Sequence, residues 1–128
     1  EMKGYTETYF GRRRYFEGLR SKIPFIRAMA ERMAINAPIQ GTEADLIKLA
    51  MVKIDELLIK EKLEDSVRLI LQVHDELVYE ADKSVAEKIV KKIKSIMETV
   101  IPKEKIKGIV LKADASMGEN WKEMKKFI

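Results

Sequence analysis

Residues 70–80 read Ile-Leu-Gln-Val-His-Asp-Glu-Leu-Val-Tyr-Glu and place His74-Asp75-Glu76 between two apolar, β-prone runs. The residues Val67–Val73 are typical of a buried strand and Leu77–Tyr79 of a second one. Burying an unpaired charge is costly, so three ionisable residues do not suit the middle of one continuous core strand. The stretch therefore predicts a tight hairpin whose bend carries His74-Asp75-Glu76, although the Asn-Gly or Asp-Gly pair usual in such turns is missing.

The two adjacent acids of this bend, Asp75 and Glu76, are suited to a divalent cation. Mg²⁺ is a hard ion that takes oxygen ligands, commonly one or two protein carboxylates together with substrate phosphates. Acidic residues are also frequent in solvated turns that bind nothing. On the residues alone, a metal site and a plain charged turn are equally open.

The composition excludes several classes of protein. A chain of 128 residues with 46% hydrophobic residues suits one globular domain with a modest core. No apolar run approaches the ~20 residues of a membrane span, and no segment resembles a signal peptide. The absence of cysteine excludes disulfides and thiolate metal sites, and a single histidine makes a structural zinc site unexpected.

The net charge of +4 permits an anionic partner, and the distribution of the charge is more informative. The first quarter of the chain is rich in Arg12, Arg13, Arg14, Arg20, Lys22, Arg27 and Arg32. Guanidinium groups pair bidentately with phosphate oxygens, so the arginine run could bind a nucleic-acid backbone. An exposed basic loop is the alternative. The later lysines alternate with glutamates, as on an ordinary solvated face.

Helical periodicity and chain breakers predict the remaining elements. Pro24 suits the first turn of a helix whose apolar stripe is Phe25, Ile26, Met29 and Met33, with Ala30 as a further candidate member. Pro38 is expected to end that helix. Capping-box patterns are expected to start two further helices, at Thr42 with Asp45 and at Ser84 with Glu87. The predicted fold class is α+β: a small antiparallel sheet with a central hairpin at about 67–80, packed against helices at about 24–36, 42–60 and 84–100, with a later strand at 106–115.

Four of these segments resemble, in the right order, motifs of the family A DNA polymerases of the bacterial polymerase I type. Residues 72–80 resemble motif C, the last catalytic motif, and Gly11–Tyr15 resembles the Gly-Arg-Arg run. Glu31–Asp45 resembles the block upstream of motif C, and Gly118–Trp121 the C-terminal end of the family. The resemblance spans nearly the whole chain.

The resemblance implies part of a polymerase palm domain. Residues 1–22 would be the end of the fingers with a basic hairpin region, and residues 23–128 the palm portion that carries motif C. The implied reaction is template-directed addition of deoxynucleotides to a primer 3′ end, in which two Mg²⁺ ions stabilise the attacking and leaving oxygens.

The resemblance also implies roles for single residues. Asp75 corresponds to the metal-binding aspartate of motif C and Glu76 to the adjacent catalytic acid, whose role is supportive. His74 corresponds to a position near the primer terminus. The other expected DNA contacts are Arg32, Asn36, Gln40, Gln72, Arg12 and Arg13. Glu43 stands where the family is expected to have alanine, so it adds a negative charge near this surface.

The family's motifs A and B, with the first metal-binding aspartate and the nucleotide-gripping lysine, are absent from the chain. It begins at Glu1, which together with the resemblance suggests a piece of a longer protein. We therefore expect no polymerisation by the chain alone. Its expected partners are the missing upstream polymerase portion, primer-template DNA and deoxynucleoside triphosphates, in the cytoplasm and near the nucleoid if the source is bacterial.

Three alternatives remain open. The first is a noncatalytic nucleic-acid-binding module. The second is a metal-dependent nuclease that uses Asp75, Glu76 and Asp114. The third is a structural piece that self-associates through exposed apolar surface.

Overall fold

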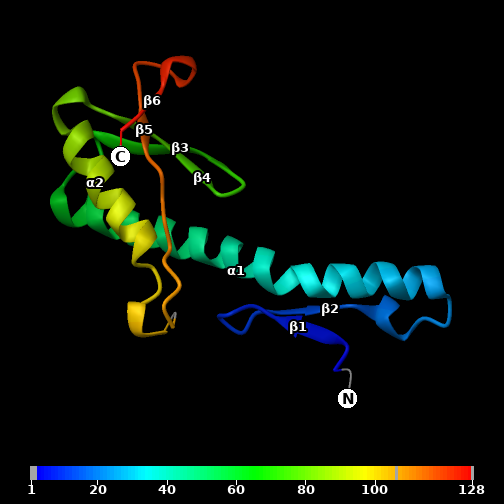
Figure 1. The fold of residues 1–128 in the computed structure, drawn as a ribbon. Helices are drawn as coiled ribbons and strands as arrows, with labels where there is room; N and C mark the ends of the chain where they lie inside the picture. Colours follow the sequence, from blue (N-terminus) through cyan, green and yellow to red (C-terminus); the bar gives the residue numbers. More distant parts are fainter. Residues whose placement is uncertain (1–2, 106, 128) are drawn as a thin grey trace. The chain divides into compact units, whose positions relative to one another are not determined.

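The computed structural model describes residues 3–105 and 107–127. Over these residues the helices are α1 (Pro24–Glu61) and α2 (Lys83–Glu98), with short 3-10 turns at Glu17–Arg20, Lys103–Lys105 and Trp121–Glu123. The strands are β1 (Tyr5–Glu7), β2 (Arg13–Tyr15), β3 (Val67–Val73), β4 (Glu76–Ala81), β5 (Ser116–Met117) and β6 (Lys125–Lys126). They pair in order as three antiparallel two-stranded sheets (Figure 1). The α+β class is confirmed, but the described residues form three small sheets where one was expected.

The chain forms two compact units, Glu1–Asp45 and Leu46–Ile128, and the boundary between them falls inside α1. The first unit contains β1, β2 and the beginning of α1. The second contains the rest of α1, α2 and the other two sheets. Each unit has its own hydrophobic cluster.

The first unit is held together by a cluster of small and aromatic side chains. Phe16 and Leu19, from the segment after β2, pack with Ala30, Ala34 and Ala37 of α1. These alanines recur at helical spacing and share one face of α1. Because alanine is short, the segment can approach the helix closely along this face.

The predicted apolar stripe of α1 is wrong for its four large side chains, and only Ala30 of that stripe is buried. Phe25 is 71% exposed and Met29 47%, and Ile26 and Met33 are exposed as well. The large apolar side chains therefore lie on the open side of the helix, and the alanines make the core contacts.

The predicted end of this helix at Pro38 is also wrong, because α1 continues without a break through Pro38 to Glu61 (Figure 1). Proline lacks an N–H and disfavours helical geometry in the preceding residue. One turn further on, the Thr42 hydroxyl donates to the Pro38 carbonyl at 2.6 Å and accepts a hydrogen bond from the Tyr9 amide at 2.9 Å. Thr42 therefore lies inside α1 and does not cap a second helix.

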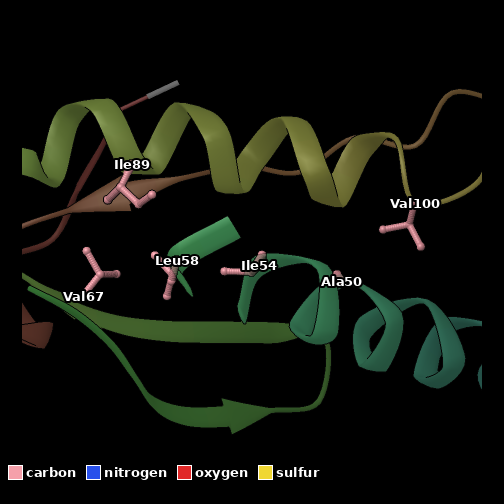
Figure 2. Packing of buried hydrophobic residues seen from close by; sticks show 6 residues of the cluster. All are labelled: Ala50, Ile54, Leu58, Val67, Ile89 and Val100. Atoms are coloured by element: carbon pink, nitrogen blue, oxygen red, sulfur yellow. The ribbon is translucent and has the colours of Figure 1, made fainter. Parts of the chain in front are cut away.

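The second unit is built on a larger cluster, which Figure 2 shows filling the space between α1, β3 and α2. Its buried members are Ala50, Ile54, Leu58, Val67, Ile89 and Val100. Ile54 and Val67 are 0% and 1% exposed, so α1 and the first residue of β3 are anchored together. This cluster supports the base of the hairpin.

The hairpin of β3 and β4 confirms the bounds of the predicted strands and adds one irregularity. The predicted burial of the first strand is wrong beyond Val67, because residues 68–72 are exposed. Leu69 pairs with Tyr79 and Leu71 with Val78, so Ile70 is an extra residue in β3 that forms a β-bulge. Tyr79 and residues of β4 on the same face pack against the core cluster. The hairpin is thus fixed to the core at its base.

The expectations for the C-terminal part are corrected at two places. Helix α2 begins at Lys83 after Asp82, which makes no side-chain cap, so the predicted capping box at Ser84 is wrong. The predicted strand at 106–115 is also wrong over residues 107–115, which pair with no strand; Ile106 lies outside the described residues.

The segment after α2 is held to the helix by side chains. The Ala113 amide donates to the Glu98 carboxylate at 3.1 Å, and the Lys94 ammonium donates to the Ala113 carbonyl and, at 2.8 Å, to Glu98. The backbone groups of Ala113 are therefore satisfied without a sheet partner.

Candidate functional site

The acidic turn (His74, Asp75 and Glu76) lies at the tip of the hairpin. Val73 pairs with Glu76, so only His74 and Asp75 form the loop and Glu76 opens β4. The three side chains are exposed. The predicted bend is therefore confirmed for His74 and Asp75, and Glu76 stands at the end of a strand.

The backbone of the turn is held by one side chain. His74 adopts φ 49°, in the left-handed region. The Gln72 carboxamide Nε2 donates a hydrogen bond of 2.9 Å to the His74 carbonyl. The structure thus brings Gln72 and His74 together, as their spacing in the sequence allows.

The carboxylates of Asp75 and Glu76 fit the oxygen chemistry of a hard divalent cation, because both are exposed and neighbouring. Over residues 3–105 and 107–127, however, no three acidic, histidine or cysteine side chains form a group that could hold a metal ion. Asp114 instead pairs with Lys126 at 3.0 Å. The turn can therefore contribute to a metal site but does not complete one, and the three acids of the nuclease alternative do not form a cluster.

The polar ridge (Arg32, Asn36 and Gln40) lies on α1 in the first unit. The sequence predicted a break near Asn36 and Gln40, but the continuous helix spaces the three residues four apart, so they lie on one face. All three are exposed. Glu43 follows Gln40 by three residues and lies on the same side. The unbroken helix therefore makes these side chains into a row.

Two of the expected phosphate-binding arginines have acidic partners within the first unit. The Arg12 guanidinium donates to Asp45 at 2.8 Å and to the Gly41 carbonyl at 3.2 Å, which ties the segment after β1 to α1. Arg13 donates to Glu7 across the β1–β2 pair, at 2.8 Å. These contacts give both arginines a structural role in addition to any ligand.

Arg14, the third arginine of the run, was not singled out as a DNA contact in the sequence analysis. The pKa of Arg13 is raised above its usual value by its hydrogen bond to Glu7. Among the described residues Arg14 has no acidic partner within ion-pair distance, and its guanidinium lies 5.1 Å from the centre of the Phe16 ring. Arg14 is therefore the arginine of the run whose charge is most available.

A cavity of about 210 Å³ opens in the first unit beside these residues. Arg12 and Gln40, both singled out in the sequence, lie at its wall, and the full lining is Thr6, Glu7, Thr8, Arg12, Arg14, Ala37, Gln40 and Gly41. Sequence reasoning named Arg14 only as part of the arginine run, and it missed Thr8. Gly41 gave no usable signal, because the sequence placed it in a break between two helices; only its position inside α1 marks a close approach of two chain segments.

The family model for DNA polymerase family A matches residues 1–123. The chain therefore belongs to the family A DNA polymerases. It is similar to the DNA polymerase I of Rhizobium leguminosarum, with 46% identity over 121 residues, which are 94% of this chain and 12% of that protein. It is also similar to the thermostable DNA polymerase I of Thermus aquaticus, with 47% identity over 119 residues, 93% of this chain and 13% of that enzyme.

Among solved structures, the chain resembles the POL domain of Pol1 from M. smegmatis in complex with DNA primer-template and dNTP. The TM-score is 0.73 at 41% identity, over 77% of this chain and 17% of that one. The chain thus spans only about one-eighth of the length of its first curated relatives. Within the described residues, no helix is long and apolar enough to cross a membrane.

Proposed function

We propose that this chain supplies the motif-C part of the active site of a DNA-directed DNA polymerase and part of the surface that binds primer-template DNA. The observation that carries the proposal is the position of Asp75: it stands in an exposed two-residue turn, on a hairpin rooted in the core, in a chain that belongs to family A. The similar Pol1 structure is named as a complex with DNA primer-template and dNTP, which supports DNA and deoxynucleotides as the proposed ligands.

In this proposal each residue of the acidic turn has its own task. Asp75 would hold a Mg²⁺ ion, which supplies positive charge for the oxygens around the reacting phosphate. Glu76, at the start of β4, supports the site by accepting hydrogen bonds from water or from the primer end. His74 lies beside the primer terminus and orients it. The short turn limits the movement of all three.

The polar ridge would bind the duplex. An amide such as that of Gln40 can donate to the minor-groove acceptors, which look alike in A·T and G·C pairs, so such contacts tolerate every sequence. Arg32 adds an attraction for phosphate that weakens as salt rises. Asn36 lies between them on the same face of α1. Arg12 and Arg13 would add positive charge near the DNA backbone while their ion pairs with Asp45 and Glu7 stabilise the first unit.

The proposal assigns residues 1–22 to the end of the fingers and residues 23–128 to the palm. The chain has no counterpart of motifs A and B, so its own residues cover half of the catalytic groups. The missing upstream polymerase portion is therefore the partner that completes the site.

The test is primer extension with Mg²⁺ and all four deoxynucleotides. The chain is assayed alone and then with the missing upstream portion of the Thermus aquaticus enzyme added in trans. We expect extension only in the mixture, and its loss on Asp75→Asn. Extension by the chain alone, or full extension with Asp75→Asn, would refute the proposal.

The same samples test the noncatalytic alternative. A simple binding module would bind primer-template equally with and without Mg²⁺, and Asp75→Asn would leave the binding unchanged. Circular dichroism of each variant shows that a loss of extension does not come from unfolding.

A further inference from the structure

The turn between β3 and β4 has a backbone conformation that costs a histidine free energy. His74 has φ 49°, where a Cβ crowds the neighbouring backbone. Of the two turn residues only His74, the first, has a positive φ. Two-residue hairpin turns with that pattern usually place glycine there, but the turn here is His-Asp. A contact from outside the two turn residues must therefore help to hold it.

Gln72 makes this contact. Its Nε2 donates to the His74 carbonyl at 2.9 Å. Gln72 pairs with Leu77 in the hairpin, directly before the last pair of Val73 with Glu76. Its side chain therefore stands next to the turn and can reach the carbonyl without any displacement of the strands.

We propose that Gln72 is a positioning residue for Asp75 and that it acts through the His74 carbonyl. That carbonyl and the Asp75 N–H belong to one planar peptide group. A hydrogen bond that fixes the oxygen fixes the plane, and with it the direction in which the Asp75 side chain leaves the backbone. Catalytic groups must be held within about 0.5 Å of their working position, so this restraint matters. The inference rests on the proposed role of Asp75.

The first arm of the test uses the 128-residue chain and needs no catalysis. Gln72→Met keeps the length of the side chain and removes the N–H donor. A positive φ gives a strong intraresidue nuclear Overhauser effect between the amide and the Hα; for His74 we expect it to weaken in Gln72→Met, and the Asp75 amide resonance to shift. The matched control Arg68→Gln, at the other end of β3, should change neither. An unchanged His74 signal in Gln72→Met would overturn the inference.

The second arm uses a complete polymerase in which residues 1–128 replace the matching segment of the Thermus aquaticus enzyme. The positioning role replaces the direct DNA contact that the family resemblance implied for Gln72. Gln72→Met should therefore lower kcat by about 2- to 12-fold, the range of one neutral hydrogen bond, and leave the Kd for primer-template unchanged. A direct DNA contact would instead raise that Kd and spare kcat, which would contradict a positioning role.

A second background separates the backbone effect from any other. Apart from glycine, the left-handed region is visited routinely only by asparagine and aspartate, whose short polar side chains can hydrogen-bond locally, so in a His74→Asn enzyme the turn depends less on Gln72. Gln72→Met should then lower kcat by a smaller factor than in the His74 enzyme. The same factor in both backgrounds would exclude an effect through the turn.

Asp75→Asn in the same polymerase separates the two proposals. If Asp75→Asn keeps full activity, the proposed function fails, and the resonances of the 128-residue chain still decide whether Gln72 holds the turn. If Asp75→Asn abolishes extension and Gln72→Met leaves kcat unchanged, the positioning role alone is refuted.

Discussion

Replacing Gly41 with alanine should destabilise the chain, although the same change inside a helix normally stabilises it. Relative to glycine, alanine favours a helix interior by about 1 kcal/mol. A Cβ on Gly41 would lie 2.7 Å from Thr8 Cγ2 and 3.4 Å from an Arg12 guanidinium nitrogen. The Thr8 methyl cannot turn away cheaply, because its hydroxyl accepts a hydrogen bond from the Arg12 amide at 3.2 Å. Overpacking of this kind costs about 1–3 kcal/mol, so we expect a net loss of about 0–2 kcal/mol.

The matched experiment removes the obstacle and restores the usual sign. In a Thr8→Ser background the hydroxyl remains and the methyl is gone, so Gly41→Ala should stabilise the chain by about 1 kcal/mol. The two effects of Gly41→Ala should thus differ by about 2 kcal/mol, which corresponds to a urea midpoint difference of roughly 1 M for a slope of 1–3 kcal/mol/M. Helical circular dichroism in urea measures both midpoints. Equal stabilisation in the two backgrounds would show that the segment after β1 does not approach α1 as described.

Three further results are expected. Ile54→Ala, at a fully buried site, should lower the free energy of unfolding by about 2–5 kcal/mol in urea titrations. The control Val52→Ala, at a site 56% exposed, should change it by less than about 0.5 kcal/mol. Similar losses for the two variants would refute the assigned core. Arg32→Ala should reduce the slope of log affinity for primer-template against log salt by about 1, and Arg27→Ala, on another face of α1, should leave it unchanged; equal slopes for the two variants would contradict binding along the polar ridge. Burial raises the pKa of Tyr79 to about 12. The folded state therefore holds this proton more tightly than the unfolded chain, and stability is lost as pH rises above the usual tyrosine value of 10.0. The difference in tyrosinate absorbance between the parent chain and Tyr79→Phe should rise near pH 12, and a rise near pH 10 would contradict the burial.

The hairpin could be predicted from the sequence because its pattern is local. Apolar, β-branched residues flank a short charged stretch, and the cost of burying His74-Asp75-Glu76 leaves a turn as the economical solution. The extra residue at Ile70 could not be predicted, since a bulge inside an apolar run leaves no mark on composition. The helix that follows the hairpin, α2, could also be predicted, because its apolar residues recur at helical spacing.

The continuity of α1 could not be predicted, because it depends on residues distant in the sequence. Pro38 predicts a helix end from local geometry alone. The hydrogen bond from Tyr9 to Thr42 and the packing of Phe16 against the alanines of α1 oppose that preference. The first contact joins residues 33 positions apart, and the second brings the segment after β2 to the helix. No local sequence pattern reveals either contact.

The candidate site was predicted unevenly for the same reason. Asp75 and Glu76 stood out as adjacent acids at a turn. The polar ridge was expected in a break between helices, and only an unbroken α1 makes Arg32, Asn36 and Gln40 a row. The hydrogen bond from Gln72 to His74 depends on the exact turn conformation. The residue types of the site could therefore be predicted from the sequence, whereas the arrangement of their side chains could be seen only in the structure.

The extra residue in β3 has a consequence for how the gene can change. Because β4 is regular, Ile70 is a spare position: the pairs before it and after it keep their own faces. A single-codon deletion at Ile70 would leave a regular hairpin with the acidic turn still facing the same way. A single-codon deletion within β4 would instead put the two halves of the hairpin out of phase, since side chains alternate strictly along a strand. Length variation in this hairpin should therefore be accepted on one strand and rejected on the other.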